Sequence, residues 1–154
     1  MMATKTATTS RPPHKPEDSL GFRLGTLSNL MALPFHAAYG KAEDLSLPEW
    51  RMLQVLDVHP GLSIVEICHH TGMHKMQASR ALQRGLRKKR LVWQADADDA
   101  RRKLVFLTAE GEALCQRLYP STAKRERELQ NFLSADQKRV LGQLLDQLIE
   151  QLRK

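Results

Sequence analysis

Cysteine is scarce in this 154-residue sequence, which has only Cys68 and Cys115. Two cysteines are too few for the disulfide framework of a small secreted domain, and they are typical of buried apolar positions in a reducing compartment. Long hydrophobic runs are also missing, because the longest candidate, residues 30–38, is far shorter than a membrane span and contains Pro34. No apolar signal segment is present near the N-terminus either. We therefore expect a soluble, cytoplasmic protein.

Catalytic constellations are absent from the sequence as well. It has no paired carboxylates, no nucleophile with an accompanying base and no glycine-rich phosphate loop. An enzyme needs such a constellation, so we expect neither catalysis nor a cofactor. Residues 1–18 are rich in Thr, Pro and Lys and lack apolar periodicity, which predicts a disordered N-terminal tail. The length predicts a single domain over residues 19–154.

Helical periodicity and helix caps dominate the remainder. Apolar residues recur at helical spacing from Leu20 to Tyr39, where Pro34 should kink or divide the helix. Three later helices should each begin at a capping box, in which a Ser side chain and the side chain three positions on satisfy early backbone amides. Gly72 should end the second of these helices in a left-handed conformation. The three boxes are Ser46 with Glu49, Ser63 with Glu66, and Ser134 with Gln137.

The periodicity changes after the helix that follows Gly72. The runs "RLVWQ" and "KLVFLT" are β-branched and aromatic, and the charged segment "ADADDARR" separates them, which predicts a two-stranded hairpin with a projecting tip. Thr108 should then begin a helix that reaches about Leu129. A short helix, a Gly turn, a second helix and a hairpin make up a winged helix-turn-helix. The predicted class is mainly α with a small β-hairpin wing.

Three stretches resemble the MarR family of bacterial transcription regulators. They are "LSLPEWRMLQVL", "HKMQASRAL", and the wing with its exit, namely Asp96, Asp99 and Arg101 followed by "LVFLTAEGEAL". The resemblance implies a winged helix-turn-helix lobe over residues 45–107, with helical dimerisation regions at 19–44 and 108–154. It also implies an obligate homodimer whose two lobes contact a palindrome. Such proteins usually have a Gly just before the wing; here Arg90 takes its place and Gly85 lies within the helix, which predicts a bulge, a close contact or an early helix end.

Positive charge is concentrated in one segment. Residues 74–103 hold ten Lys or Arg and three Asp, a net charge of +7, which equals that of the whole chain. This is the distribution expected for a surface that contacts duplex DNA. Ala78, Leu82 and Leu86 should face the core, which directs the N-terminal residues of this helix outward. The predicted DNA contacts are Ser63, His74, Lys75, Met76, Gln77, Ser79, Arg80, Arg84, Arg101 and Arg102.

The wing tip has its own predicted roles. Arg101 aligns with the arginine that the family resemblance implies enters the minor groove, where narrow A·T tracts concentrate negative potential. Asp96 and Asp99 should orient its guanidinium. The alternative interpretation, a solvated charge cluster, is favoured for Asp98 and Arg102, because exposed ion pairs contribute little.

The segment "CHHTGMHKM" at 68–76 resembles a metal-binding sequence. Consecutive residues on a helix point about 100° apart, so Cys68, His69 and His70 cannot easily converge on one ion, and Gly72 interrupts the path to His74. We expect Cys68 in the core and no metal. A metal-responsive regulator that uses Cys68, His69, His70 and His74, with His14, His36 or His59 as further ligands, stays the alternative. Thiol sensing is disfavoured, since the family's hydroperoxide sensors place their reactive Cys in the first helix, and residues 20–40 contain none.

Two further surfaces complete the prediction. The last helix has an apolar stripe that is too wide for one neighbouring helix to cover, which predicts dimerisation through Leu141, Leu144, Leu145, Leu148, Ile149 and Leu152. The resemblance implies a small aromatic or anionic effector between the dimer base and the winged lobe. The matching residues are Met31, His36, Tyr39, Trp50, Arg51 and Met52. Met and Trp at helical spacing are also typical of plain core.

The sequence thus predicts a sequence-specific regulator that binds double-stranded DNA as a homodimer. We expect a repressor that an effector releases from a palindromic operator, although the residues themselves do not distinguish repression from activation. A non-specific architectural DNA-binding protein would have the same basic segment, and it stays an alternative until binding to different duplexes is compared.

Overall fold

The computed structural model describes residues 15–99 and 101–154, which form two compact units that divide between Leu45 and Ser46. A single 3-10 turn, η1, precedes the first helix; the part of the predicted tail before residue 15 lies outside the described residues. None of the described helices is both long and apolar enough to cross a membrane. The elements are η1 Pro16–Asp18, α1 Leu20–Phe35, η2 His36–Gly40, α2 Leu47–Val58, α3 Ile64–Thr71, α4 Lys75–Arg87, β1 Leu91–Ala95, β2 Lys103–Leu107, α5 Ala109–Gln130 and α6 Ala135–Leu152.

The first unit is a helix that changes type after its proline. Ser19 caps α1 through a hydrogen bond from the Phe22 amide, 3.2 Å long. Pro34 cannot donate a backbone hydrogen bond, and the α-helix ends one residue later, where the π-helix η2 begins. The predicted division of this helix at Pro34 is therefore confirmed. Phe35 and Tyr39 are buried, with their rings edge to face at 5.1 Å.

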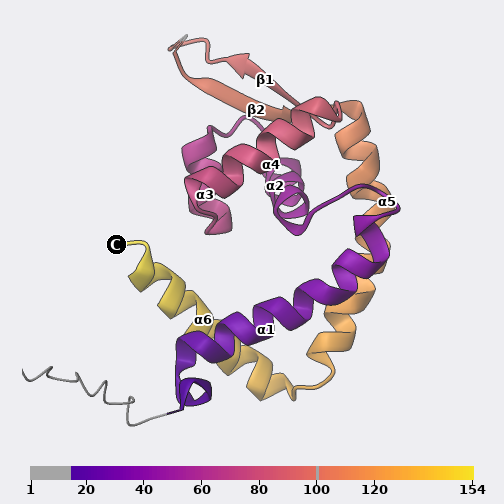
Figure 1. The fold of residues 1–154 in the computed structure, drawn as a ribbon. Coiled ribbons are helices and arrows are strands. Elements are labelled where there is room, and N and C mark those ends of the chain that lie inside the picture. The colour runs from indigo at the N-terminus through magenta and orange to yellow at the C-terminus, as the bar shows by residue number, and fades with distance from the viewer. Residues whose placement is uncertain (1–14, 100) are drawn as a thin grey trace, which may run out of the picture. The chain divides into compact units, whose positions relative to one another are not determined.

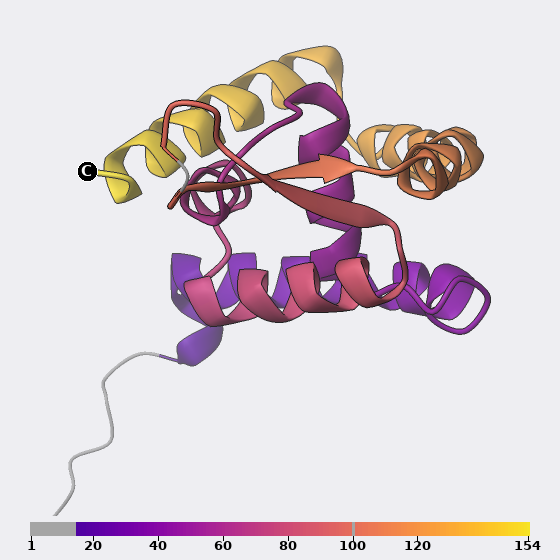
Figure 2. The same cartoon turned by 90° about the horizontal axis from the view of Figure 1, so that it is seen from above.

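The second unit contains the winged helix-turn-helix (Figure 1). All three predicted capping boxes are present, at the starts of α2, α3 and α6. Gly72 ends α3 in the left-handed region, with φ of 68°, as predicted. Figure 2 shows α3 nearly end-on and α4 side-on, so the two helices cross after this turn. The predicted α-helical fold with a β-hairpin is confirmed.

The hairpin projects from α4 and returns to α5. β1 and β2 are antiparallel, with Leu91 opposite Leu107 and Ala95 opposite Lys103. Leu91 is buried at its base and Val105 at the middle of β2, while the remainder of β1 is exposed, so the end of the wing extends beyond the core (Figure 1). The exposed ring of Trp93 lies under the Lys103 ammonium, 3.8 Å from nitrogen to ring centroid.

The junction between α4 and the wing shows how the chain passes Gly85. The Arg90 amide donates to the Gly85 carbonyl and the Lys89 amide to that of Leu86, which is the Schellman arrangement, with Lys89 at φ of 54° in the position that usually favours Gly. Gly85 is a close contact, one of the three predicted alternatives, because a β-carbon there would collide with the side chain of Leu91. Gly111 makes a second close contact, since a β-carbon at this position would collide with the Arg90 carbonyl.

Candidate nucleic-acid interface

The N-terminal half of α4 presents a polar surface. His74 caps the helix, its Nδ1 accepting a hydrogen bond from the Met76 amide at 3.4 Å. Lys75, Met76, Gln77 and Arg80 are exposed, as predicted, whereas Ser79 is half-buried. Arg80 forms no ion pair with any residue in 15–99 or 101–154, so its guanidinium is available to an external acceptor. Helix α4 therefore offers hydrogen-bond donors and an amide at its outward face.

The opposite face of α4 consists of small residues. Ala78, Ala81 and Gly85 are buried, whereas Leu82 and Leu86 are only half-buried, so the predicted core row of Ala78, Leu82 and Leu86 is only partly right. Small side chains allow α4 to pack close to its neighbours, and Leu91 fills the space over Gly85. A groove beside the start of α2 adjoins this face. Its lining residues are Ser46, Pro48, His74, Met76, Gln77, Arg80, Ala81 and Arg84.

Glu49 joins α2 to α4. Its Oε2 accepts from the Ser46 hydroxyl at 2.6 Å, and Arg84 Nε donates to the same oxygen at 2.9 Å. Lys88 Nζ lies 3.0 Å from Oε1. Burial acts to raise the pKa of Glu49, which is only 3% exposed, but the hydrogen bonds from Ser46 and the ammonium of Lys88 outweigh it, so its pKa lies below the usual value. Arg84, a predicted DNA contact, is thus also a structural ion-pair partner.

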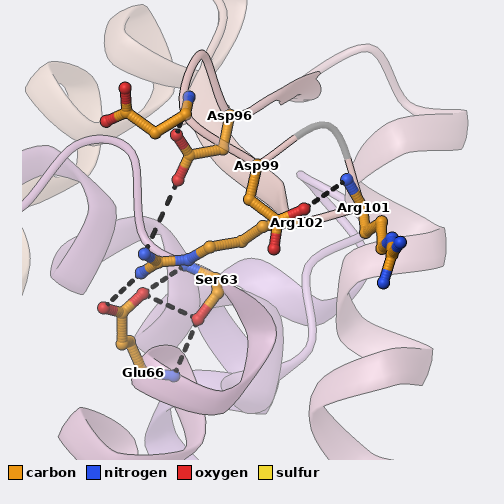
Figure 3. Close-up of polar contacts among 7 residues, drawn as sticks. Ser63, Glu66, Asp96, Asp99, Arg101 and Arg102 are labelled. Carbon is orange, nitrogen blue, oxygen red and sulfur yellow. Dashed lines mark hydrogen bonds and ion pairs between the residues drawn. The ribbon is translucent and has the colours of Figure 1, made fainter.

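Glu66 joins α3 to the wing in the same way (Figure 3). Its Oε2 accepts from the Ser63 hydroxyl at 2.6 Å and its Oε1 from Arg102 Nη2 at 2.7 Å. Hydrogen bonds from the hydroxyl and amide of Ser63, then from Arg102, lower the pKa of Glu66 to about 2. Arg102 also pairs with Asp96 at 3.5 Å. Arg102 thus lies in an exposed charge cluster, as predicted, but this cluster also joins the wing to α3.

The two acids of the wing order the loop and do not hold Arg101 by its guanidinium, which corrects the predicted orientation. The Asp99 carboxylate accepts from the backbone amide of Arg101 at 3.0 Å, and that of Asp96 accepts from the amide of Asp98 at 3.0 Å. Short polar side chains bond to nearby amides in this way at turns. The side chain of Arg101 points away from Glu66 and Asp96 (Figure 3). It is therefore exposed beside a residue whose own side chain is tied to α3.

The histidine-rich segment has no metal-binding geometry. Within the described ranges, no three His, Cys, Asp or Glu side chains converge on one point. His70 stacks on His59 at 4.8 Å, and the His69 carbonyl accepts from Arg153 at 2.8 Å. Cys68 is half-buried, so its predicted place in the core is only partly right, because Ile67 takes the fully buried position of α3. His14 lies outside the described residues.

Cys115 is the buried thiol of the chain. Burial, reinforced by Asp57 and Glu112, raises the pKa of Cys115 to about 12. A thiolate is the reactive form of cysteine, so this side chain is poorly suited to redox sensing.

The predicted effector residues have different environments. Trp50 and Met52 are buried, and the Trp50 ring packs 5.6 Å from that of Tyr119, so both belong to the core of the second unit. Arg51 is exposed. In the first unit, Met31 and His36 are exposed and Tyr39 is buried. The plain-core interpretation therefore describes Trp50 and Met52, and effector contact stays a prediction for all six.

The two capping glutamates have a second role that the sequence did not predict. Glu49 and Glu66 are recognisable as cap partners from residues three positions away, but their basic partners lie 35 to 39 positions along the chain. Neither Lys88 nor Trp93 has a role predicted from the sequence. The excess of Arg and Lys in residues 74–103 signals that basic partners for the capping acids are available. Nothing local in the sequence pairs particular Arg or Lys residues with Glu49 or Glu66.

Comparison with known proteins finds the same fold and a family to which part of the chain is similar. A model of the MarR family matches residues 43–102, which span the helix-turn-helix and the first part of the wing. Over these residues the chain is similar to the MarR family. The transcriptional regulator HosA of Escherichia coli O157:H7 is 26% identical over 106 residues, which cover 69% of this chain and 78% of HosA. MarR-family proteins are DNA-binding transcription regulators and not enzymes.

Several solved structures share the architecture. A MarR/EmrR family regulator from Acinetobacter sp. ADP1 has a TM-score of 0.82 at 23% identity and covers 90% of this chain and 98% of its own. BpsR of Bordetella bronchiseptica, whose DNA binding is regulated by 6-hydroxynicotinic acid, has a TM-score of 0.78 at 20% identity, with 88% and 96% covered. PcaV of Streptomyces coelicolor, solved with its natural ligand, has a TM-score of 0.75 at 22% identity, with 89% and 96% covered.

Proposed function

We propose that this protein is a MarR-family regulator, namely a sequence-specific double-stranded DNA-binding repressor. The outward face of α4 carries the proposal: Lys75, Gln77 and Arg80 are exposed together at its N-terminal end. The amide of Gln77 matches the donor and acceptor pair of adenine, and the fork of Arg80 matches guanine or a phosphate. Arg101 on the wing would enter the adjacent minor groove.

Phosphates would bind beside this face. The groove between the start of α2 and α4 is lined by His74, Arg80 and Arg84, whose donors suit a DNA phosphate. Arg84 keeps its bond to Glu49 and is 40% exposed, so it could serve as both a structural and a phosphate-binding group. Two further residues, Ser63 and Arg102, would lie near the DNA backbone and would not recognise bases. The hydroxyl of Ser63 already donates to Glu66, and Arg102 donates to the same carboxylate.

Dimerisation would bring two such surfaces onto a palindromic operator. The predicted interface residues of α6 are exposed, apart from half-buried Leu145. An apolar stripe of this extent is stabilised when a second copy covers it. The test is sedimentation of Leu148→Glu against Gln143→Glu, which places the same charge on the same helix outside the stripe. A dimer that dissociates only in Leu148→Glu supports the interface, and a wild-type monomer at micromolar concentration contradicts it.

An effector is the remaining part of the proposal. BpsR and PcaV share the fold; 6-hydroxynicotinic acid regulates the DNA binding of BpsR, and PcaV was solved with its natural ligand. A ligand would regulate this chain if it bound better to a dimer whose winged lobes are spaced unlike successive major grooves. The six predicted residues are the first to substitute once a ligand is found.

The deciding experiment is a titration of two duplexes by fluorescence anisotropy at physiological salt, with chelator present. One duplex comes from the DNA beside the gene for this protein, and the other is a shuffled duplex of equal composition. A preference of about a thousandfold establishes operator recognition. Equal binding to these and to duplexes selected from a random library indicates a non-specific DNA-binding protein. If the preference appears only when the titration is repeated with zinc in place of the chelator, the metal-responsive alternative is favoured.

A further inference from the structure

We propose that Glu66 is a positioning residue for the wing. Its carboxylate accepts a hydrogen bond from Arg102 and so holds that residue at the N-terminus of α3. This contact determines the position of Arg101 relative to α4. The inference rests on the proposed function, because Arg101 is the wing residue expected to contact DNA. It adds a role for two side chains, Glu66 and Arg102, for which the sequence predicted helix capping and a place in a charge cluster.

The carboxylate is oriented by its own helix. Glu66 Oε2 accepts from the Ser63 amide at 2.7 Å and from the Ser63 hydroxyl at 2.6 Å. These two bonds fix the side chain and leave Oε1 directed at Arg102 Nη2, 2.7 Å away. Arg102 therefore meets an acceptor that is already in place, so fewer rotamers are lost when the contact forms.

β2 is held at its middle, where Val105 is buried, its amide donates to the Leu62 carbonyl at 2.9 Å and its carbonyl accepts from the Gly61 amide at 3.0 Å. β1 and the loop at the tip have less support. Only Leu91 of β1 is buried, and the four residues after it are exposed. A two-stranded hairpin is marginally stable without a surface to pack on. Within the loop the Asp96 amide donates to the Arg102 carbonyl at 2.9 Å and the Arg102 amide to that of Asp99 at 2.8 Å. These bonds hold the loop together internally, while the contact from Arg102 to Glu66 ties it to a helix.

Arg101 and Arg102 have opposite roles at this tip. The side chain of Arg102 turns to Glu66, and that of Arg101 points away from it (Figure 3). No hydrogen bond or ion pair from the Arg101 guanidinium to the described part of the chain is present. Arg102, which is bound to Glu66, is thus the immediate neighbour of Arg101, whose guanidinium is available. A displacement of Arg102 therefore also displaces Arg101.

The contact is suited to positioning more than to stability. The side chains of Glu66 and Arg102 are 40% and 46% exposed, and ion pairs at such exposure contribute little to folding. A Gln at position 66 can still complete the capping box, since its side-chain oxygen accepts from Ser63. Glu66→Gln therefore removes the charge on the contact to Arg102 and leaves α3 capped.

The test compares duplex preference in five variants of the full chain. They are Glu66→Gln, Arg102→Gln, the double variant, Arg101→Ala, and Arg101→Ala with Glu66→Gln. The probe is a duplex that wild-type protein selects from a random library, against its shuffled counterpart. Glu110→Gln is the matched control, because it removes one exposed carboxylate at the start of α5, three residues after β2 ends and so at the opposite end of that strand from the wing tip.

We expect Glu66→Gln and Arg102→Gln each to lower the preference about tenfold, the double variant to be no worse than either, and Glu110→Gln to be unchanged. In the Arg101→Ala background, Glu66→Gln should cause no further loss. A full further loss in that background means that Glu66 acts elsewhere and overturns the proposal. Unchanged preference in Glu66→Gln overturns it as well.

Hydrogen exchange without DNA separates this proposal from the proposed function. Glu66→Gln should speed exchange at the amides of Asp96 and Arg102 and leave those of α6 unchanged. If the wild-type protein prefers no duplex, the proposed function fails, and the exchange rates still decide whether Glu66 fixes the wing. Equal exchange rates in the variant and the wild type would show that it does not.

Discussion

Arg84 Nε lies 2.9 Å from Glu49 Oε2, so the helix proposed to contact DNA bonds directly to the carboxylate that caps α2. The same oxygen accepts from the amide and the hydroxyl of Ser46. Lys88, the residue that follows the end of α4, completes the cluster through Oε1. One buried acid therefore determines both where α2 begins and how α4 lies against it.

Replacing Glu49 should destabilise the second unit strongly. Glu49→Ala removes the cap partner of α2 and leaves half-buried Lys88 without its carboxylate, and loss of a cap and of a largely buried ion pair together cost about 2–4 kcal/mol. Urea unfolding at fixed protein concentration measures the free energy. Glu110→Ala serves as the control, and a loss no larger than in that control would contradict the role given to Glu49.

Removing Arg101 should weaken DNA binding through its charge. Arg101→Ala should lower the magnitude of the slope of log affinity against log salt by about 0.9, since the variant neutralises one phosphate fewer and releases correspondingly fewer counterions. Lys138→Ala, an equal charge change on exposed α6, should leave the slope unaltered. Anisotropy titrations at several salt concentrations give both slopes. Identical slopes for wild-type protein and Arg101→Ala would show that the wing tip does not reach the phosphates.

A methyl group at Gly85 should disrupt the junction between α4 and the wing. Gly85→Ala gains about 1 kcal/mol of helix propensity, but the new β-carbon collides with the Leu91 side chain, and such overpacking costs about 1–3 kcal/mol. We expect a net loss of stability. Gly25→Ala on α1 has nothing within 4 Å of its new β-carbon and should be neutral or stabilising. Thermal unfolding of both variants checks the pair, and equal shifts would mean that Leu91 simply moves aside.

Acid should remove the contribution of Glu66. Its folded pKa of about 2 lies below the ordinary value of 4.5, so the folded state binds its proton less readily than the unfolded state does. The stabilisation is therefore complete above about pH 4.5 and is lost as pH falls from there toward 2. The difference in Tm between wild-type protein and Glu66→Gln should shrink over this range. NMR titration of the Glu66 carboxyl carbon gives the pKa directly, and a midpoint near 4.5 would refute the assigned hydrogen bonds.

Local signals account for what the sequence predicted well. Capping boxes, Gly72 and the hairpin depend on residues within a few positions of one another, and the structure has them where expected. The prediction for the core face of α4 missed Ala81 and Gly85, because these residues carry little hydrophobic signal, although packing selects them for their size. The left-handed conformation of Lys89 has no signal in the sequence, since nothing in a lysine side chain favours it.

The contacts of Arg84 and Arg102 could not be inferred for a different reason. Each joins elements more than thirty positions apart, and many other Arg and Lys residues in the basic segment were equally plausible partners for the capping acids. Only the packing of α4 on α2 and of the wing beside α3 decides which cations face Glu49 and Glu66.

The two tryptophans of the chain lie in contrasting surroundings. Trp50 is 3% exposed beside Tyr119, whereas Trp93 is 45% exposed on the wing under Lys103. A water-soluble quencher such as acrylamide will therefore dim Trp93 selectively, and Trp50 will provide an internal reference. The wild-type protein consequently carries its own fluorophore on the wing, and the arrival of a partner at that hairpin can be followed by light emission without attaching a dye.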